Sequence, residues 1–326
     1  RTIKRHFSRL WISMNRKASH AGSWYDDKGK ALSKQLKGWL DEVKVSVSGS
    51  PRAIISPHAG YSYSGPTAAY AYKHINPKTV KRVFILGPSH HHSTGGCELS
   101  QCSVYETPIE NLALDQETIA KLHKTGLFDK MSQSVDEAEH SIEMQLPILA
   151  EIMKGSSFKV VPVLVGSLSP ESEKEYGRVF APYLDDPDNF FIISSDFCHW
   201  GKRSDCQGNL CRFQYTHYDK SKGKIWQSIQ ALDQEGMKLI ESQDAAGFTK
   251  YLDSFENTIC GRHPISVFLQ VDIFVINLVQ ALKASSQKYR VQFVRYAQSE
   301  QCTSTSDSSV SYAAAVSVLA DSGKKE

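Results

Sequence analysis

The chain has 326 residues, of which 40% are hydrophobic and 22% are charged. This composition is typical of a globular protein with a large core, and it excludes an intrinsically disordered chain. The formal net charge is +3, and four of the basic residues stand in the first thirteen positions, which hold no acidic residue. Since the rest of the chain is close to neutral, we expect no basic surface for nucleic acid.

The first residues differ in composition from the rest of the chain. Residues 1–13 are basic and contain bulky apolar side chains, a composition that fits a mitochondrial transit peptide in outline. Met14 precedes Asn-Arg-Lys as a start residue would. The simpler interpretation is that residues 1–13 are upstream or unprocessed sequence. We expect residues 1–15 to be a basic extension outside the fold and residues 16–322 to form one domain.

Seven cysteines stand at irregular spacings, and we recognise no signal peptide before them. Reduced thiols in a cytoplasmic protein are therefore expected, with the nucleus as a second location. Cys206 and Cys211 could pair in an exposed loop, but a reducing compartment disfavours that disulfide.

Hydrophobic periodicity predicts alternating helices and strands. In chain order, the expected elements are a helix over 28–44, a strand over 52–55, a helix over 65–74, a strand over 82–86, helices over 115–124 and 141–153, a strand over 159–165, a helix opened by Ser169 and Pro170, a strand over 190–193, a loop over 201–217, helices over 222–240, 244–255 and 264–284, and strands over 291–296 and 310–319. This alternation predicts a single α/β domain with a central mixed β-sheet flanked by helices.

Proline and polar residues qualify these elements. Pro66 is expected in the first turn of its helix, where its missing N–H is tolerated. Pro147 should kink its helix or begin a new segment, and Pro162 indicates an edge strand or a bulge. The most apolar segment, 264–284, carries Asp272, so we expect a buried helix and no membrane insertion.

Three strand-like segments share one feature, because reactive side chains follow each apolar run directly. His58 follows the first run, His90 the second, and Asp196 with His199 the third. Ligands in open α/β sheets bind beyond the carboxyl ends of the strands, so these side chains are expected to converge. Imidazole is a good ligand for iron, copper and zinc. Two histidines and one anionic ligand would leave coordination positions open.

Each of these residues also has a structural alternative. His58 stands between proline and glycine, where it could serve only as a hydrogen-bonded turn residue. At least one ring of the triple histidine run must point away from a common centre, so His91 and His92 are discounted. Asp196 and His199 are one helical turn apart, which alone is a weak signal.

Cys260 stands just before the most apolar helix. Arg262, His263 and the helix N-terminus are expected to lower the pKa of its thiol, which makes Cys260 a candidate ligand or nucleophile. An inert buried thiol is the alternative. His140 and Glu143 share one helical face and are interpreted as supporting residues.

Nine segments, in order along the chain, together resemble the Memo family: ASHAGSWY (18–25), PHAGYSYSG (57–65), FILGPSHH (84–91), DEAEHSIEMQLP (136–147), PVLVG (162–166), SSDFCHWG (194–201), TICGRHPI (258–265), YAQS (296–299) and DSSVSYAA (307–314). The resemblance extends from about Lys17 to Ala320. It implies a fold similar to that of the class III extradiol dioxygenases, which use non-haem iron.

The resemblance also implies a particular metal site. His58, His90 and Cys260 match the family positions that hold iron or copper, and Asp196 and His199 match the nearby Asp and His of the family's SSDFCHWG motif. In the dioxygenases the matching histidine is a general base, so we expect Asp196 and His199 to be the catalytic residues. Cys260 stands where the dioxygenases carry a carboxylate. A thiolate is softer, favours copper(I) and can itself be oxidised. We therefore expect copper- or iron-dependent redox chemistry rather than ring cleavage.

Three functions are open at this point. The first is a metal-dependent redox protein. The second, implied by the family, is an adaptor that binds phosphorylated receptor tyrosine kinase tails or adaptor proteins and acts on the cytoskeleton and cell motility, with a vestigial dioxygenase pocket. In that function Arg262 is either a phosphate contact or part of a structural ion pair. The third is a thiol hydrolase with Cys260 as nucleophile and His199 or His263 as base, which is disfavoured because no oxyanion-hole sequence is apparent.

One segment departs from the family pattern. Residues 202–213 are longer than the family norm and follow shortly after His199. We interpret them as a loop insertion.

Overall fold

Alternating helices and strands make up the part of the chain that the computed structural model describes, residues 14–201, 214–281 and 289–319. Its helices are α1 (Gly29–Glu42), α2 (Tyr61–Tyr72), α3 (Gln116–His123), α4 (Gln133–Ala138), α5 (His140–Glu143), α6 (Leu146–Ile152), α7 (Pro170–Asp185), α8 (Ile225–Glu241), α9 (Ala245–Phe255) and α10 (Arg262–Ala281). Its strands are β1 (Asn15–Arg16), β2 (Ser50–Ser56), β3 (Arg82–Pro88), β4 (Cys97–Ser100), β5 (Val104–Tyr105), β6 (Leu112–Ala113), β7 (Phe128–Met131), β8 (Lys159–Val165), β9 (Asn189–Ser194), β10 (His199–Trp200), β11 (Tyr289–Gln298) and β12 (Ser309–Leu319).

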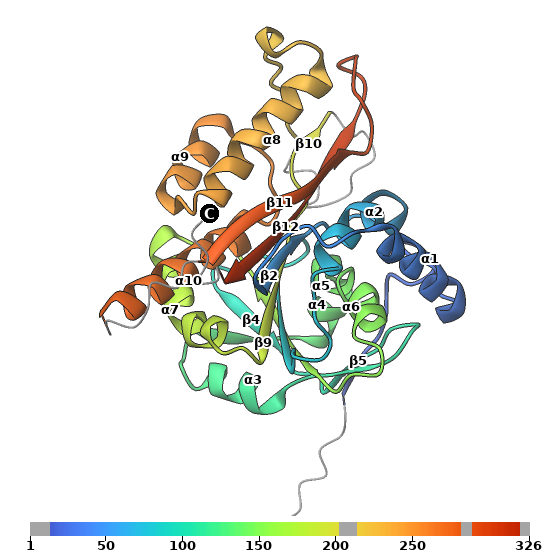
Figure 1. Ribbon diagram of the computed structural model, residues 1–326, viewed down its shortest axis with the longest axis vertical. Coiled ribbons are helices and arrows are strands. Elements are labelled where there is room, and N and C mark those ends of the chain that lie inside the picture. The colour runs from blue at the N-terminus through green and yellow to red at the C-terminus, as the bar shows by residue number, and fades with distance from the viewer. Residues whose placement is uncertain (1–13, 202–213, 282–288, 320–326) are drawn as a thin grey trace, which may run out of the picture.

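A nine-stranded sheet forms the centre of the molecule. Its order is β10-β12-β2-β9-β3-β8-β4-β7, with β11 paired to β12. The strands β2, β9, β3 and β8 are parallel, whereas β12 and β4 run antiparallel to β2 and β8. In Figure 1, α1, α2 and α6 lie on one side of this sheet and α7 and α10 on the other. The predicted α/β domain with a central mixed sheet between helices is confirmed.

The parallel strands are apolar in their central residues because helices cover both faces of the sheet. In β9, the residues from Phe190 to Ile193 are at most 1% exposed. In contrast, α1 buries only one face, through Leu32, Leu36 and Leu40. A helix on the outer layer needs no more than one apolar stripe, which explains why its periodicity was visible in the sequence.

Two proline predictions were wrong. Pro66 lies inside α2, because the helix begins earlier than expected, at Tyr61. Pro66 and Ser62 are both exposed, so water can bind the Ser62 carbonyl that proline leaves without a helical partner. Pro162 lies in β8, which is an interior strand. Its missing N–H is tolerated because β4 pairs with β8 only from Val163 onward.

The prediction for Pro147 was right in its second form, since a new helix, α6, begins there. The short strands β1, β4, β5, β6, β7 and β10 were not predicted, because two to four residues are too few to show alternation. Residues 1–13, the proposed insertion with Cys206 and Cys211, and the end of the predicted helix after Ala281 lie outside the described residues.

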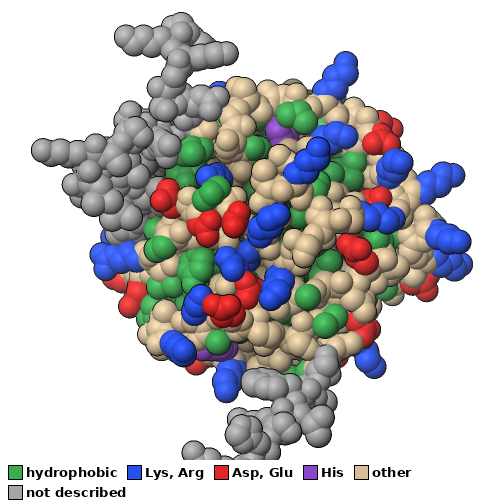
Figure 2. Space-filling model, turned by 60° about the horizontal axis from the view of Figure 1, so that its bottom comes forward, with side chains coloured by type: hydrophobic (Ala, Val, Ile, Leu, Met, Phe, Trp, Pro, Cys, Tyr) green, Lys and Arg blue, Asp and Glu red, His purple; other side chains and the backbone are tan. Residues whose placement is uncertain are grey.

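None of the described helices is both long and apolar enough to cross a membrane. On the face shown in Figure 2, Lys and Arg side chains are interspersed with Asp and Glu.

Candidate metal centre

The carboxyl ends of three neighbouring parallel strands carry the predicted site residues. His58 follows β2, Asp196 follows β9 and His90 follows β3, and these strands pair in the order β2-β9-β3. The ring centroids of His58 and His90 lie 5.2 Å apart. The expected convergence of these strand ends is therefore observed.

A third imidazole, that of His140, joins this pair. Its ring centroid lies 4.3 Å from that of His90 and 5.4 Å from that of His58. One nitrogen atom of each of the three rings lies within 4.8 Å of the other two, so these histidines could hold a metal ion. In the part of the chain that the structure describes, no other His, Cys, Asp or Glu side chains form such a group. The sequence pattern indicated only a supporting role for His140.

A glycine at the end of β3 lets His140 approach. A Cβ atom on Gly87 would lie 2.6 Å from Ser141 Oγ and 2.8 Å from Ile142, closer than atoms can pack. The Ser141 hydroxyl donates to the carbonyl of Pro88 at 2.8 Å. These contacts pack α5 directly against the end of β3 and bring His140 to His90.

The hydrogen bonds of Ser194 fix the protonation of His58. The Ser194 hydroxyl donates its single proton to the carbonyl of Ser141 at 2.7 Å and accepts a hydrogen bond from Gln145 Nε2 at 2.9 Å. Its 2.7 Å contact with His58 Nδ1 therefore requires the imidazole to be the donor. Nε2 of His58 is left with a lone pair, as a metal ligand needs.

Glu139 has the same effect on His90. It accepts hydrogen bonds from the backbone N–H of His90 at 2.7 Å and from Nδ1 at 2.9 Å, which again leaves Nε2 with the lone pair. Burial would raise the pKa of Glu139, but the interactions with His90 outweigh it and hold that pKa well below its usual range. Nδ1 of His140 lies 3.5 Å from Glu139 and is buried without a hydrogen-bond partner among the described residues. A buried nitrogen without a hydrogen-bond partner is suited to bind a cation, which would take the place of that partner.

Burial lowers the pKa of His58 and of His140 well below the usual value, and the neighbouring His90 lowers both further. Both rings are therefore neutral at physiological pH. Because imidazole binds metals only in its neutral form, these two rings are already in the state that metal binding requires. Its nitrogen donors suit iron, copper or zinc.

Cys260 lies beside His58, with 3.1 Å between Sγ and Nε2. Gly261 allows this contact, because a side chain there would collide with Ser195 and with the backbone of Ser194. Cys260 does not belong to the group of three whose ligand atoms all lie within 4.8 Å of one another. Its sulfur therefore contacts one predicted ligand, His58, but is not a further member of this group of histidines.

The pKa predicted for Cys260 was wrong in direction. Loss of solvent raises the pKa of this thiol well above its usual value, and Asp196 raises it further. His263, expected to lower this pKa, instead contacts Glu173 through Nδ1 at 2.8 Å. A neutral thiol is a poor nucleophile, which removes the main support for a thiol hydrolase.

Asp196 and His199 lie beside the cluster. Asp196 Oδ1 accepts the backbone N–H of His58 at 2.9 Å. Burial raises the pKa of Asp196 to about 7, although backbone hydrogen bonds from His58 and Ala59 oppose the rise. His199 Nδ1 lies 2.8 Å from the carbonyl oxygen of Phe197 and so carries a proton. A carboxyl group that titrates near neutral pH can hold or release a proton during a reaction.

Two histidines discounted from the sequence lie outside the cluster. His91 and His92 are exposed, and His92 Nε2 lies 3.1 Å from Glu98 Oε1. Neither belongs to the group of three.

Sequence reasoning missed Arg16, which lies behind the histidines. Its side chain is fully buried and forms ion pairs with Asp136 at 2.9 Å and with Glu143 at 2.7 Å. The acidic run over 136–143 could have indicated it, since carboxylates that fold inward need a buried cation.

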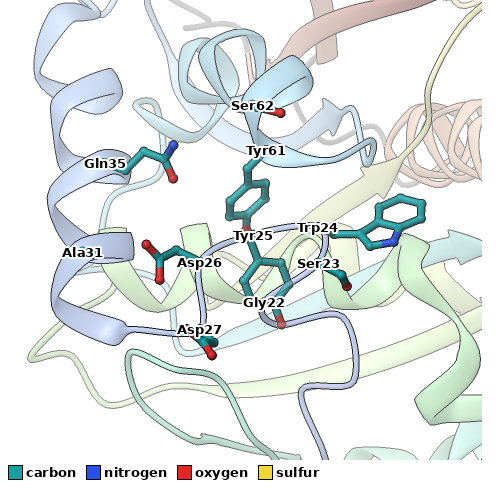
Figure 3. Close-up of a pocket in the computed structure, with 10 residues that line it drawn as sticks. All are labelled: Gly22, Ser23, Trp24, Tyr25, Asp26, Asp27, Ala31, Gln35, Tyr61 and Ser62. Atoms are coloured by element: carbon teal, nitrogen blue, oxygen red, sulfur yellow. The ribbon is translucent and has the colours of Figure 1, made fainter.

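A cavity of about 500 Å³ opens next to the cluster (Figure 3). It is lined by Gly22, Ser23, Trp24, Tyr25, Asp26, Asp27, Ala31, Gln35, Tyr61 and Ser62. In Figure 3, Asp26 and Gln35 lie on one side of the rings of Tyr25 and Tyr61, and the Trp24 ring points to the other side. The Trp24 ring lies 4.5 Å from that of His140, so one indole separates cavity and cluster. The volume is typical of small-molecule sites.

Fold and cluster together define a single-domain α/β protein with three histidines that could hold a metal ion. The family model described as Memo-like protein matches residues 16–316. The chain therefore belongs to the Memo-like family, and the resemblance seen in the nine sequence segments is confirmed.

Relatives from distant animals match almost the whole chain. Protein MEMO1 of Danio rerio is 51% identical over 306 residues, which cover 93% of this chain and 97% of the relative. Protein MEMO1 of Homo sapiens is 48% identical over 301 residues, or 92% of this chain and 96% of the relative. The protein memo-1 homolog of Caenorhabditis elegans is 45% identical over 303 residues, or 92% and 82%.

Proposed function

We propose that this Memo-like protein binds iron or copper and acts in redox chemistry. The proposal rests on the arrangement of lone pairs. Nε2 carries no proton in His58 and in His90, and Nδ1 of His140 is buried without a partner among the described residues. Bound iron or copper would supply one-electron chemistry at this place.

His58 and His90 are the proposed histidine ligands. Cys260 is the proposed anionic ligand, because its sulfur lies 3.1 Å from Nε2 of His58, and it would lose its proton on binding. His140 is the alternative third ligand, supported by its position in the group of three.

Asp196 and His199 are the proposed catalytic residues. The carboxyl group of Asp196 has its pKa raised by burial to about 7, so it can hold a proton beside the site and release it. His199 lies close enough to His58 to lower the pKa of that imidazole. We propose that His199 moves protons to and from the bound substrate.

Ring-cleaving dioxygenase activity is not part of the proposal. Enzymes with the two-histidine, one-carboxylate pattern place a carboxylate among the metal ligands. Here the groups that meet at His58 are imidazoles and a thiol. This donor set favours electron transfer over ring cleavage.

Metal analysis of protein purified without added metal tests the proposal. We expect iron or copper in the protein as isolated, and its loss in His58→Ala and His90→Ala. Cys260→Ser and His140→Ala then identify the third ligand by which of them loses the metal. His123→Ala is the control, because His123 lies on α3 and binds the carbonyl of Phe128. Full metal content in both His58→Ala and His90→Ala would refute the proposal.

We further propose that the protein acts in receptor tyrosine kinase signalling in the cytoplasm, with the nucleus as a second location. Its partners would be phosphorylated receptor tails or adaptor proteins. The cavity beside Trp24 supports this proposal, since its aromatic wall could receive a tyrosine ring. Asp26 and Asp27 would repel a phosphate, which must then lie on the side of the histidines.

Paired titrations test the signalling proposal. A tyrosine-phosphorylated peptide and its unphosphorylated form are titrated into the protein, and tryptophan fluorescence is followed because Trp24 lines the cavity. We expect tighter binding of the phosphorylated form and a loss of that preference in His90→Ala. Equal affinities of the two peptides would rule out phosphate recognition.

A further inference from the structure

Glu143 lies at the centre of a buried network behind the histidines. Its side chain is 1% exposed, and it accepts four hydrogen bonds. They come from Arg16 Nη2 at 2.7 Å, His20 Nδ1 and backbone N–H at 2.8 Å each, and the Tyr25 hydroxyl at 2.6 Å. Burial alone would raise the pKa of Glu143, but the hydrogen bond from His20 and the charge of Arg16 hold it at about 2. The carboxylate is therefore ionised and bonded at both oxygens.

Arg16 connects the same network to the segment that carries His140. Its Nε donates to the carboxylate and the carbonyl of Asp136 at 2.9 and 3.0 Å, and its Nη2 donates to the carbonyl of Glu139 at 3.0 Å. The guanidinium lies 5.2 Å from the centre of the Tyr105 ring. A fully buried arginine bonded in this way is held in one position.

Both segments tied together by this network reach the histidine cluster. On the N-terminal side, the Trp24 ring packs against His140 with 4.5 Å between ring centroids and an angle of 38° between the ring planes. On the other side, Glu139 fixes the tautomer of His90. Arg16 and Glu143 touch neither His58 nor a substrate position, so any effect they have on the centre must pass through these neighbours.

We propose that Arg16 and Glu143 form a positioning pair for the metal centre, which holds residues 16–25 against residues 136–143 and thereby fixes His90 and His140. The inference rests on the proposed metal-binding function. It makes the N-terminal strand β1 part of the centre, although its residues bind no ion themselves. Groups behind the ligands that orient them typically change metal affinity by about 10–100-fold when they are replaced.

The test compares Arg16→Gln with Arg82→Gln. Arg82 also forms a close ion pair, with Asp115 at 2.6 Å, but it lies at the start of β3, whereas His90 follows the end of that strand. Both variants lose a cation from an ion pair, so both are expected to unfold at a lower temperature. Only Arg16→Gln should bind Cu(I) about 10-fold or more weakly, measured by competition with a chromogenic Cu(I) chelator.

A second measurement does not depend on metal. In long-range ¹H–¹⁵N spectra of the metal-free protein, His90 should show one tautomer in the wild type and in Arg82→Gln, and a mixture in Arg16→Gln. If Arg16→Gln does not fold, Glu143→Gln is the alternative variant. Its amide would turn an N–H toward Arg16 or His20, which are themselves donors, and would so disrupt the network. It should give the same mixture and the same loss of affinity.

The outcomes separate the two proposals. Wild-type protein that binds no Cu(I) or Fe(II) would refute the proposed function, while the tautomer of His90 would still test the positioning pair. A single His90 tautomer and wild-type Cu(I) affinity in folded Arg16→Gln or Glu143→Gln would overturn the inference alone.

Discussion

Glu139 binds His90 twice, at the backbone N–H and at Nδ1, with distances of 2.7 and 2.9 Å. An ionised carboxylate can only accept, so this pair of bonds decides which nitrogen of His90 keeps its lone pair. The hydrogen bond to the backbone N–H also fixes the position of the His90 main chain, from which the imidazole extends.

Replacement of Glu139 by Gln is expected to weaken metal binding by about 10–100-fold, because an amide can donate to Nδ1 and favour the wrong tautomer. Affinity is measured by chelator competition. Glu117→Gln is the control, since Glu117 forms an exposed ion pair with Lys121 on α3. Equal affinities for Glu139→Gln and the wild type would contradict the role given to this carboxylate.

Replacement of Ser194 by Ala is expected to lower the free energy of unfolding by about 1–3 kcal/mol. The change leaves His58 Nδ1, Gln145 Nε2 and the carbonyl of Ser141 without the hydroxyl that they share. Urea unfolding of the metal-free protein measures the loss. The exposed Ser62→Ala should stay within about 0.5 kcal/mol of the wild type, and a similarly small effect at Ser194 would sink the prediction.

Two glycines offer a matched pair of substitutions to alanine. At Gly261 the new methyl group would collide with Ser195, so we expect a loss of about 1–3 kcal/mol and faster alkylation of Cys260 by iodoacetamide. At Gly38, inside α1, the methyl group meets no atom within 4 Å, and a gain of about 0.5–1 kcal/mol is expected. Thermal unfolding measures the change in stability, and alkylation rates measure the reactivity of Cys260. Unchanged Cys260 reactivity in Gly261→Ala would contradict the close packing of Gly261 against Ser195.

The stability of the fold should fall as the pH rises from about 4 to 6, in part because of Asp233. This carboxyl group on α8 is fully buried, and burial raises its pKa from 3.8 to about 6, although hydrogen bonds from Asn257, Ser311 and Tyr296 oppose the rise. Since the folded pKa lies above the unfolded one, the contribution is fully present below about pH 4 and is lost as the pH passes 6. It amounts to about 3 kcal/mol.

Asp233→Asn should remove this part of the pH dependence, as measured by urea unfolding between pH 4 and 7. Asp253→Asn, an exposed position on α9, should leave the slope unchanged. Identical slopes for Asp233→Asn and the wild type would contradict the raised pKa.

The sequence predicted those parts of the centre that depend on local pattern. His58, His90 and Asp196 each follow an apolar run, and parallel strands of one sheet must end at the same edge. Their convergence needed no knowledge of packing. His140 could not be found in this way, because it comes from a helix and reaches His90 only through the contact of α5 with Gly87.

Long-range and solvent effects account for the other misses. The pKa of Cys260 depends on desolvation, which a count of neighbouring charges in the sequence does not include. Arg16 is bonded to residues more than a hundred positions away. Pro66 is accepted inside α2 because that turn faces solvent, which the sequence pattern alone did not reveal.

The contact between His58 and Cys260 joins two residues that are 202 positions apart. An ion held by both would act as a removable crosslink, and closing so long a loop reduces the freedom of the unfolded chain more than a short loop would. Loading with metal should therefore slow the breakdown of the whole protein by proteases, so that the cellular supply of the ion would set how long each copy survives.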